Sequence, residues 1–288
     1  MKVPELGVRI EEWRTAMAQT EHFSLDKTPP EKIFELWDAM ADGFDSGLGQ
    51  DIGRVIHTLE ILTRIGALHE DTIAIDIGCG TGTFTLELAK HCRKVYAFDL
   101  SPKMLAALDR KAAEQGASNI VTICADWKAM DLSEFDPDIS LALACLNTGL
   151  YDFEGLDKMN RVSKGWCCYM TSAGLKQAPN KNELQEIVFG RTLKSANGND
   201  IIFPFNVIYT MGYSPELHYV PCSWSDSSSK EEAIDDLVEN YSRYKDIDSD
   251  TKRRIEAYVD SQLDEFGRYP RSVNTTLGVM TWNTAQEL

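Results

Sequence analysis

Three aspartates in the first half of the chain stand at or near the ends of short apolar runs. Asp76 lies inside the first run, at residues 73–77, and Asp99 and Asp126 close the next two. In an open α/β sheet, ligands bind at the carboxyl ends of the strands. A carboxylate there can accept hydrogen bonds from ammonium, hydroxyl or amino groups. The three aspartates therefore indicate a site for a polar ligand that carries several donors.

A glycine-rich turn separates the first run from the helix expected after it. The spacing is Asp76-x-Gly78-x-Gly80-x-Gly82, and apolar residues resume at Phe84. Glycines let the backbone turn sharply and let a ligand approach closely, and a helix N-terminus offers unpaired N–H groups. A strand, a glycine turn and a helix suit a nucleotide. A dinucleotide fingerprint would require glycine at position 83, where the chain has threonine, and a carboxylate in the turn would repel a pyrophosphate.

The stretch from Asp76 to Gly82 resembles motif I of the class I S-adenosylmethionine-dependent methyltransferases. The resemblance implies that Asp76 lies near the amino-acid end of S-adenosyl-L-methionine, with Gly78, Cys79, Gly80 and Gly82 beneath it. S-adenosyl-L-homocysteine would be the product of this cofactor. A glycine turn that binds no ligand is the alternative.

Two further segments extend the resemblance. Asp99-Leu100-Ser-Pro-x-Met104 resembles motif II, which implies that Asp99 binds both ribose hydroxyls while Leu100 and Met104 pack on the adenine. Asp126 is implied to accept from the adenine amino group, with Trp127 stacked beside the ring. Asp99 alone would fit NAD equally well, Met104 would also fit a helix core, and Asp126 would also fit an exposed strand end.

The fourth predicted strand, residues 139–146, is continuously apolar, as expected of a parallel strand buried on both faces. Asn147 follows it and, by the resemblance, lines the cofactor pocket. DNA and RNA amino-methyltransferases carry Asn/Asp-Pro-Pro-aromatic at this tip, whereas Asn147-Thr-Gly-Leu150 has no proline. The tip therefore argues against a nucleic-acid acceptor.

The sequence contains no recognisable catalytic pair. A sulfonium activates its own methyl group, so orientation and exclusion of water supply most of the rate, and a general base is needed only for a protonated acceptor. Tyr151, Asp152 and His57 are candidates by position alone. Each of them can equally be structural.

An aromatic segment ahead of the glycine turn predicts a lid. The run from Trp37 to Phe44 resembles the tryptophan- or tyrosine-led segment that folds over the cofactor pocket in many small-molecule methyltransferases. Glycines around Phe44 could serve as a hinge for its closure. The acceptor would lie between this segment, the strand tip up to Tyr151 and an inserted segment that ends at Tyr213. A fixed helical layer that only fills the core is the alternative.

The composition limits the partners. The 288 residues carry a formal net charge of -16, and an acidic surface repels phosphate backbones, which argues against nucleic acid as the partner. No apolar run approaches the roughly 18 residues of a membrane span, and the N-terminus lacks the apolar centre of a signal peptide. The seven scattered cysteines indicate reduced core residues. We therefore expect a cytoplasmic protein without a metal site; its oligomeric state is open.

The order of elements predicts a doubly wound, mostly parallel α/β sheet. The resemblance implies seven strands, with an antiparallel last strand inserted between strands five and six. We expect an N-terminal helical cap or lid over residues 1–66 and a Rossmann-like methyltransferase domain over residues 67–288, with helical insertions at about 175–212 and 229–266.

The expected function is methyl transfer from S-adenosyl-L-methionine to a small-molecule acceptor. Two alternatives come from other classes. One is a non-catalytic protein that binds the same cofactor, because the motif indicates binding and not turnover. The other is a nicotinamide-dependent oxidoreductase, against which Asp76 and the missing glycine both count.

Overall fold

The structure is a computed structural model that describes most of the chain after residue 51 and short pieces before it. The described residues are 11–13, 15, 34–35, 37–39, 41, 44–46, 52–134, 138–147, 150, 153–177, 181–191, 200–242 and 245–286. Among these residues, no helix is both long and apolar enough to cross a membrane.

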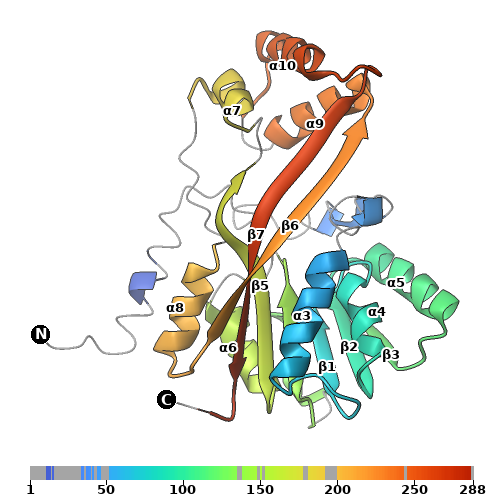
Figure 1. Cartoon of the computed structure of the whole chain (residues 1–288), viewed down its shortest axis with the longest axis vertical. Coiled ribbons are helices and arrows are strands. Elements are labelled where there is room, and N and C mark those ends of the chain that lie inside the picture. Colours follow the sequence, from blue (N-terminus) through green and yellow to red (C-terminus); the bar gives the residue numbers. More distant parts are fainter. Residues whose placement is uncertain are drawn as a thin grey trace, which may run out of the picture. The chain divides into compact units, whose positions relative to one another are not determined.

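Seven strands form one sheet in the order β3-β2-β1-β4-β5-β7-β6 (Figure 1). The strands are β1 (Ile73–Ile77), β2 (Lys94–Asp99), β3 (Ile120–Cys124), β4 (Leu141–Cys145), β5 (Trp166–Gln177), β6 (Glu216–Ser228) and β7 (Tyr269–Asn283). β1 pairs in parallel with β2 and β4, and β3 and β5 continue the parallel pairing outward. β7 is antiparallel to the others and lies between β5 and β6. The prediction of a doubly wound sheet with an inserted antiparallel last strand is confirmed.

The helices connect these strands in the predicted order. They are α3 (Ile52–Arg64), α4 (Thr83–Ala89), α5 (Pro102–Gln115), α6 (Phe153–Val162), α7 (Lys181–Phe189), α8 (Ile202–Thr210), α9 (Lys230–Ser242) and α10 (Ser249–Gln262). α5 begins with Ser101, whose hydroxyl accepts from the Met104 N–H at 3.2 Å, and Pro102 occupies its first turn. α10 ends four residues before residue 266, because Leu263 has an extended backbone.

The centre of the sheet is buried on both faces. Every residue of β1 is buried, as are the first four residues of β4. Because helices cover both sides of a parallel sheet, such strands read as continuous apolar runs. Asp76 is the polar exception in β1, so the fold holds a carboxyl group in the middle of its core.

The chain divides into two compact units. The first comprises Met1–Gly174, Asn197–Cys222 and Thr276–Leu288, and the second comprises Leu175–Ala196 and Ser223–Thr275. The second unit has its own apolar core, built from α7, α9 and α10 and including Leu184, Ile255 and Val259. All the predicted site residues belong to the first unit. The expected division into a cap over residues 1–66 and a catalytic domain stays a prediction.

Candidate functional site

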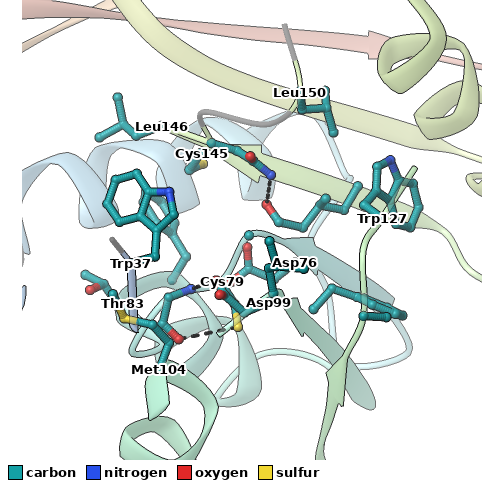
Figure 2. A pocket seen from close by; sticks show the side chains of 18 of the residues that line it. Trp37, Asp76, Cys79, Thr83, Asp99, Met104, Trp127, Cys145, Leu146 and Leu150 are labelled. Atoms are coloured by element: carbon teal, nitrogen blue, oxygen red, sulfur yellow. Dashed lines mark hydrogen bonds between the residues drawn. The ribbon is translucent and has the colours of Figure 1, made fainter. Parts of the chain in front are cut away.

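A cavity of about 240 Å³ opens at the carboxyl ends of the central strands (Figure 2). It is lined by Trp37, Phe44, Arg54, Asp76, Ile77, Gly78, Cys79, Gly80, Thr83, Phe84, Phe98, Asp99, Leu100, Met104, Ala125, Asp126, Trp127, Lys128, Cys145, Leu146, Asn147 and Leu150. In Figure 2, Asp76 and Asp99 lie between Trp37 and Trp127. Residues from β1, β2, the loop after β3 and the tip of β4 therefore share one pocket, as expected at this edge of a parallel sheet.

Two glycines of the turn after β1 stand where a side chain would not fit. Gly78 has a φ of +72°, and a Cβ there would lie 2.5 Å from Nδ2 of Asn147. Gly82 has a φ of +90°, and a Cβ there would lie 2.3 Å from Leu108. A left-handed backbone favours glycine. Of the turn residues, Gly78 and Gly80 line the cavity with backbone alone, on either side of Cys79.

Asp76 is 2% exposed, and its Oδ2 accepts a hydrogen bond from the Thr85 hydroxyl at 2.6 Å. Burial raises the pKa of the Asp76 carboxyl from 3.8 to about 7. The hydrogen bond from Thr85 opposes this rise, and the neighbouring Asp99 carboxylate adds to it. A buried negative charge needs a partner. The pocket is therefore suited to a ligand that brings a positive charge or strong donors to Asp76.

Asp99 ends β2 and holds the glycine turn in place. Its Oδ2 accepts from the Gly80 N–H at 2.8 Å, and its Oδ1 accepts from the Ser101 N–H at 2.9 Å. Burial raises the pKa of the Asp99 carboxyl, and the N–H donors of Ser101 and Gly80 act in the opposite direction. A carboxylate has about four lone-pair sites. Two backbone donors leave capacity for two hydroxyl groups of a ligand.

The loop after β3 forms another wall of the cavity. Oδ1 of Asp126 accepts from the Lys128 N–H at 2.9 Å, which fixes the start of this loop. Trp127 is 7% exposed and meets Phe98 edge to face, with ring centroids 5.8 Å apart. The indole N–H of Trp127 is buried and has no hydrogen-bond partner among the described residues. The wall offers an aromatic surface, one carboxylate and a spare donor.

The tip of β4 bends sharply into the pocket. Leu146 has a φ of +54°, and its N–H donates to the Met170 carbonyl at 2.8 Å. This turn lets Nδ2 of Asn147 reach back to the Ile77 carbonyl at 2.9 Å. A left-handed backbone at a leucine costs on the order of 1 kcal/mol. Backbone strain of this kind is common at ligand-binding sites. Here the strained turn lies in a run of three residues that line the cavity, Cys145, Leu146 and Asn147.

Arg54 contributes a buried positive charge to the cavity. It lies in the first turn of α3, is 3% exposed and lines the pocket. Burial raises the pKa of the Cys145 thiol, and the positive charge of the Arg54 guanidinium acts against this rise. A guanidinium is well suited to bind a carboxylate. The pocket thus holds a cation as well as carboxylates.

The aromatic segment before α3 lies over the pocket in this structure. Trp37 and Phe44 contact each other edge to face, at 6.4 Å between ring centroids, and both line the cavity. Two carboxylates attach this segment to α5, to its N-cap residue Ser101 and to the glycine turn. Asp38 accepts from the Ser101 hydroxyl at 2.9 Å and pairs with Lys103 at 3.0 Å. Asp45 accepts from the Thr81 hydroxyl at 2.5 Å and pairs with Lys111 at 2.9 Å.

Most of the predicted site residues meet in this one cavity. Gly82, Tyr213 and His57 are not among the residues that line it. Gly82 caps α4 instead, and His57 is exposed, with Nδ1 2.7 Å from the Gly53 carbonyl. Tyr151, Asp152 and the expected hinge glycines at positions 43, 47 and 49 lie outside the described residues. No group of three potential metal ligands occurs within the described ranges.

Several polar residues at the cavity or in the aromatic segment before α3 were not predicted from the sequence: Thr83, Lys128, Arg54, Asp38 and Asp45. Arg54 has a weak sequence signal, because it shares the helical spacing of Thr58 and Ile61 on the buried face of α3. Asp38 follows Trp37 and Asp45 follows Phe44. The sequence around these aspartates does not indicate that they bind residues 36 to 66 positions away. Long-range partners of this kind are visible only in the folded chain.

Comparison with known proteins gives partial matches. Residues 74–164 match the sequence family described as a methyltransferase domain. Over 74 residues the chain is 35% identical to the "Probable cobalt-precorrin-6B C(15)-methyltransferase (decarboxylating)" of Methanothermobacter thermautotrophicus, covering 26% of this chain and 38% of that protein. Over 109 residues it is 28% identical to the ribosomal RNA small subunit methyltransferase A of Bacillus thuringiensis, covering 38% and 37%. The chain therefore spans less than half the length of these two relatives.

A longer match joins the chain to an uncharacterised protein of Haemophilus influenzae, at 26% identity over 204 residues, covering 69% of this chain and 68% of that protein. Two solved structures share the fold. A protein of Bacillus halodurans has a TM-score of 0.51 at 15% identity, covering 82% of this chain and 99% of that chain. The YcgJ protein of Bacillus subtilis has a TM-score of 0.50 at 12% identity, covering 80% and 99%. At such identities the likeness concerns the fold alone.

Proposed function

We propose that this chain, whose residues 74–164 belong to a Rossmann-like methyltransferase domain, transfers a methyl group from S-adenosyl-L-methionine to a small-molecule acceptor. One observation carries the proposal. Asp76 and Asp99, from two neighbouring parallel strands, line the same cavity together with Gly78 and Gly80 of the glycine turn between them. This arrangement suits a ligand with an ammonium group at one end and a ribose beyond it.

The residues present fit the cofactor group by group. Asp76 is a buried carboxyl group in need of a positive partner, and Arg54 is a buried guanidinium that can face a carboxylate. Together they complement a zwitterionic amino acid. Asp99 retains lone pairs for two ribose hydroxyls after its two backbone bonds. Asp126 and the ring of Trp127 then remain for the adenine amino group and face.

The cofactor supplies an activated methyl group on its sulfonium, so the chain needs to orient the reactants and keep water out. Trp37 and Phe44 line the cavity, and their rings would exclude water from a bound cofactor if they close over it. Leu146 and Leu150 add further apolar surface to the cavity. We assign the acceptor to the space between this aromatic pair and the tip of β4.

Two rival functions are less well supported. A nicotinamide dinucleotide would bring its pyrophosphate against the glycine turn, where the Asp76 carboxylate would repel it. The partial similarity to a ribosomal RNA methyltransferase favours a nucleic acid as the methyl acceptor. However, the net charge of -16 opposes a phosphate backbone. A small acceptor remains the better proposal.

Methyl transfer can be tested directly with a cofactor whose methyl group carries deuterium. The protein would be incubated with a metabolite extract and, separately, with total RNA, and labelled products would be detected by mass spectrometry. We expect label in a small molecule only, and a loss of more than about 90% of this label in Asp99→Asn, since the ribose contacts weaken. Label confined to the RNA would contradict the small-molecule acceptor. S-adenosylhomocysteine formation in neither mixture would favour the non-catalytic alternative.

A further inference from the structure

Lys158 is a buried lysine outside the predicted site. It lies on α6, is 7% exposed and precedes the core residue Met159. A buried ammonium is costly unless its donors are all satisfied. Burial lowers the pKa of the Lys158 ammonium, as does the charge of Arg161. An apolar residue would pack at this position without that cost, so the ammonium requires an explanation.

The ammonium of Lys158 binds three carbonyl groups of one loop. It donates to the carbonyls of Trp127, Lys128 and Met130, the second at 3.1 Å. An ammonium has three donors and no acceptor, so these three bonds satisfy it. Three carbonyl dipoles that converge on one point would otherwise repel one another. A single cation therefore ties three carbonyl groups of this loop together.

The same ammonium also lies against the aromatic wall of the cavity. Nζ of Lys158 is 5.2 Å from the ring centroid of Trp127, within the range of a cation–π contact. The loop it holds contains Asp126, Trp127 and Lys128, which all line the pocket. Lys158 itself does not line the cavity, so its effect on a ligand has to pass through this loop.

We propose that Lys158 is a positioning residue for the wall of the cavity formed by Asp126 and Trp127, the wall assigned to the adenine base. By binding three carbonyl groups of the loop after β3, Lys158 sets the orientation of these two side chains. It thereby determines the preference of the site for adenine over other purines. This inference rests on the proposed function, because it assigns the base end of the cofactor to this wall. Lys158 touches no reacting group and acts only through the loop.

The test compares two ligands that differ only in the base. S-adenosylhomocysteine carries the 6-amino group that Asp126 can accept from, and S-inosylhomocysteine carries an oxygen there. Titration calorimetry should give the wild-type protein a preference of about 100-fold for the adenine compound, since the wrong partner leaves a charged acceptor unpaired. Lys158→Met should reduce this preference to less than about tenfold by weakening adenine binding. The matched control Lys164→Met removes an exposed lysine just after α6 and should keep the wild-type ratio.

The proposal also predicts a change without ligand. Hydrogen exchange at the Met130 amide, which donates to the Asp126 carbonyl at 3.1 Å, should be at least about tenfold faster in Lys158→Met, while the amides of β4 stay protected. If Lys158→Met does not fold, Lys158→Gln retains two N–H donors and should show a smaller loss of preference. An unchanged adenine preference in a folded variant at position 158 would overturn the role of Lys158. Wild-type protein that binds neither ligand would instead overturn the proposed function.

Discussion

Asp76 is a carboxyl group that the fold keeps in its core beside a second one. Burial raises its pKa to about 7, with Asp99 adding to the effect. Because this pKa exceeds the ordinary value of 3.8, the folded state binds the proton more tightly than the unfolded chain does. The resulting stabilisation is complete below pH 3.8 and is lost as the pH rises through about 7. In the protein without ligand, the charge that Asp76 acquires as the pH rises through about 7 is therefore unfavourable.

Asp76→Asn should remove this pH dependence, because an amide does not titrate over this range. Urea unfolding of the variant and the wild type should be compared at about pH 5.5 and about pH 8.5. The variant should gain about 2 kcal/mol relative to the wild type between these values. If the two stability curves stay parallel, Asp76 does not titrate near neutral pH.

Asp99→Asn should weaken S-adenosylhomocysteine binding by about 100-fold, since one acceptor oxygen and the charge are lost. We prefer asparagine to alanine, because Asp99 also accepts from Gly80 and Ser101 and an alanine would leave both N–H groups unpaired. Calorimetry measures the affinity, and thermal unfolding serves as the control for the fold. An affinity equal to that of the wild type would show that Asp99 does not bind the ribose.

At the scale of elements, the glycine turn combines backbone strain with lack of space. Gly78 and Gly116 have similar φ values, +72° and +68°, but a Cβ would contact Asn147 only at position 78. Gly116→Ala should therefore show the cost of the left-handed backbone alone, about 1 kcal/mol. Gly78→Ala should cost more, by roughly a further 1–3 kcal/mol, and should also lose ligand binding. Equal losses of stability, with binding intact, would mean that the turn does not form the floor of the site.

The predicted lid is the second element whose motion can be tested. If Trp37 and Phe44, which line the cavity, close over a bound ligand, residues 37–46 should become protected from hydrogen exchange when S-adenosylhomocysteine is added. The Lys111 and Thr81 contacts hold the pKa of Asp45 below its usual range against the opposing effect of burial. Asp45→Asn should raise exchange in this segment, whereas Asp109→Asn, at an exposed carboxylate on α5, should not. Equal protection with and without ligand would leave the segment as fixed packing.

The elements that could be predicted are those with local signals. The apolar run at residues 73–77 predicts β1 with the correct bounds, and a serine followed by a proline, at positions 101 and 102, is typical of a helix start such as that of α5. The apolar stretches at residues 166–172 and 215–224 predict shorter strands than β5 and β6, which continue to Gln177 and Ser228 and end in polar residues. Pairing with neighbouring strands gives such residues backbone partners that no apolar pattern records. The carbonyl partners of Lys158, 28 to 31 positions away, were equally hidden from the sequence.

At the scale of the whole molecule, charge decides between acceptors. With a net charge of -16, the protein should not bind RNA at about 0.15 M salt, because it lacks the excess of cations that releases counterions from a phosphate backbone. Filter binding over a range of salt concentrations measures this directly. RNA binding that weakens steeply as the salt concentration rises would contradict the proposal of a small-molecule acceptor. It would instead support an RNA acceptor, as the name of the ribosomal RNA methyltransferase relative suggests.

The central claim is that the cavity at the carboxyl ends of the strands binds the sulfonium cofactor and its product. Thermal unfolding with S-adenosylhomocysteine and, in parallel, with NAD tests this claim most directly. At about 100 times its dissociation constant, S-adenosylhomocysteine should stabilise the fold by roughly 2.7 kcal/mol, and NAD should have no effect. Stabilisation by NAD, with none from S-adenosylhomocysteine or S-adenosylmethionine, would contradict the account.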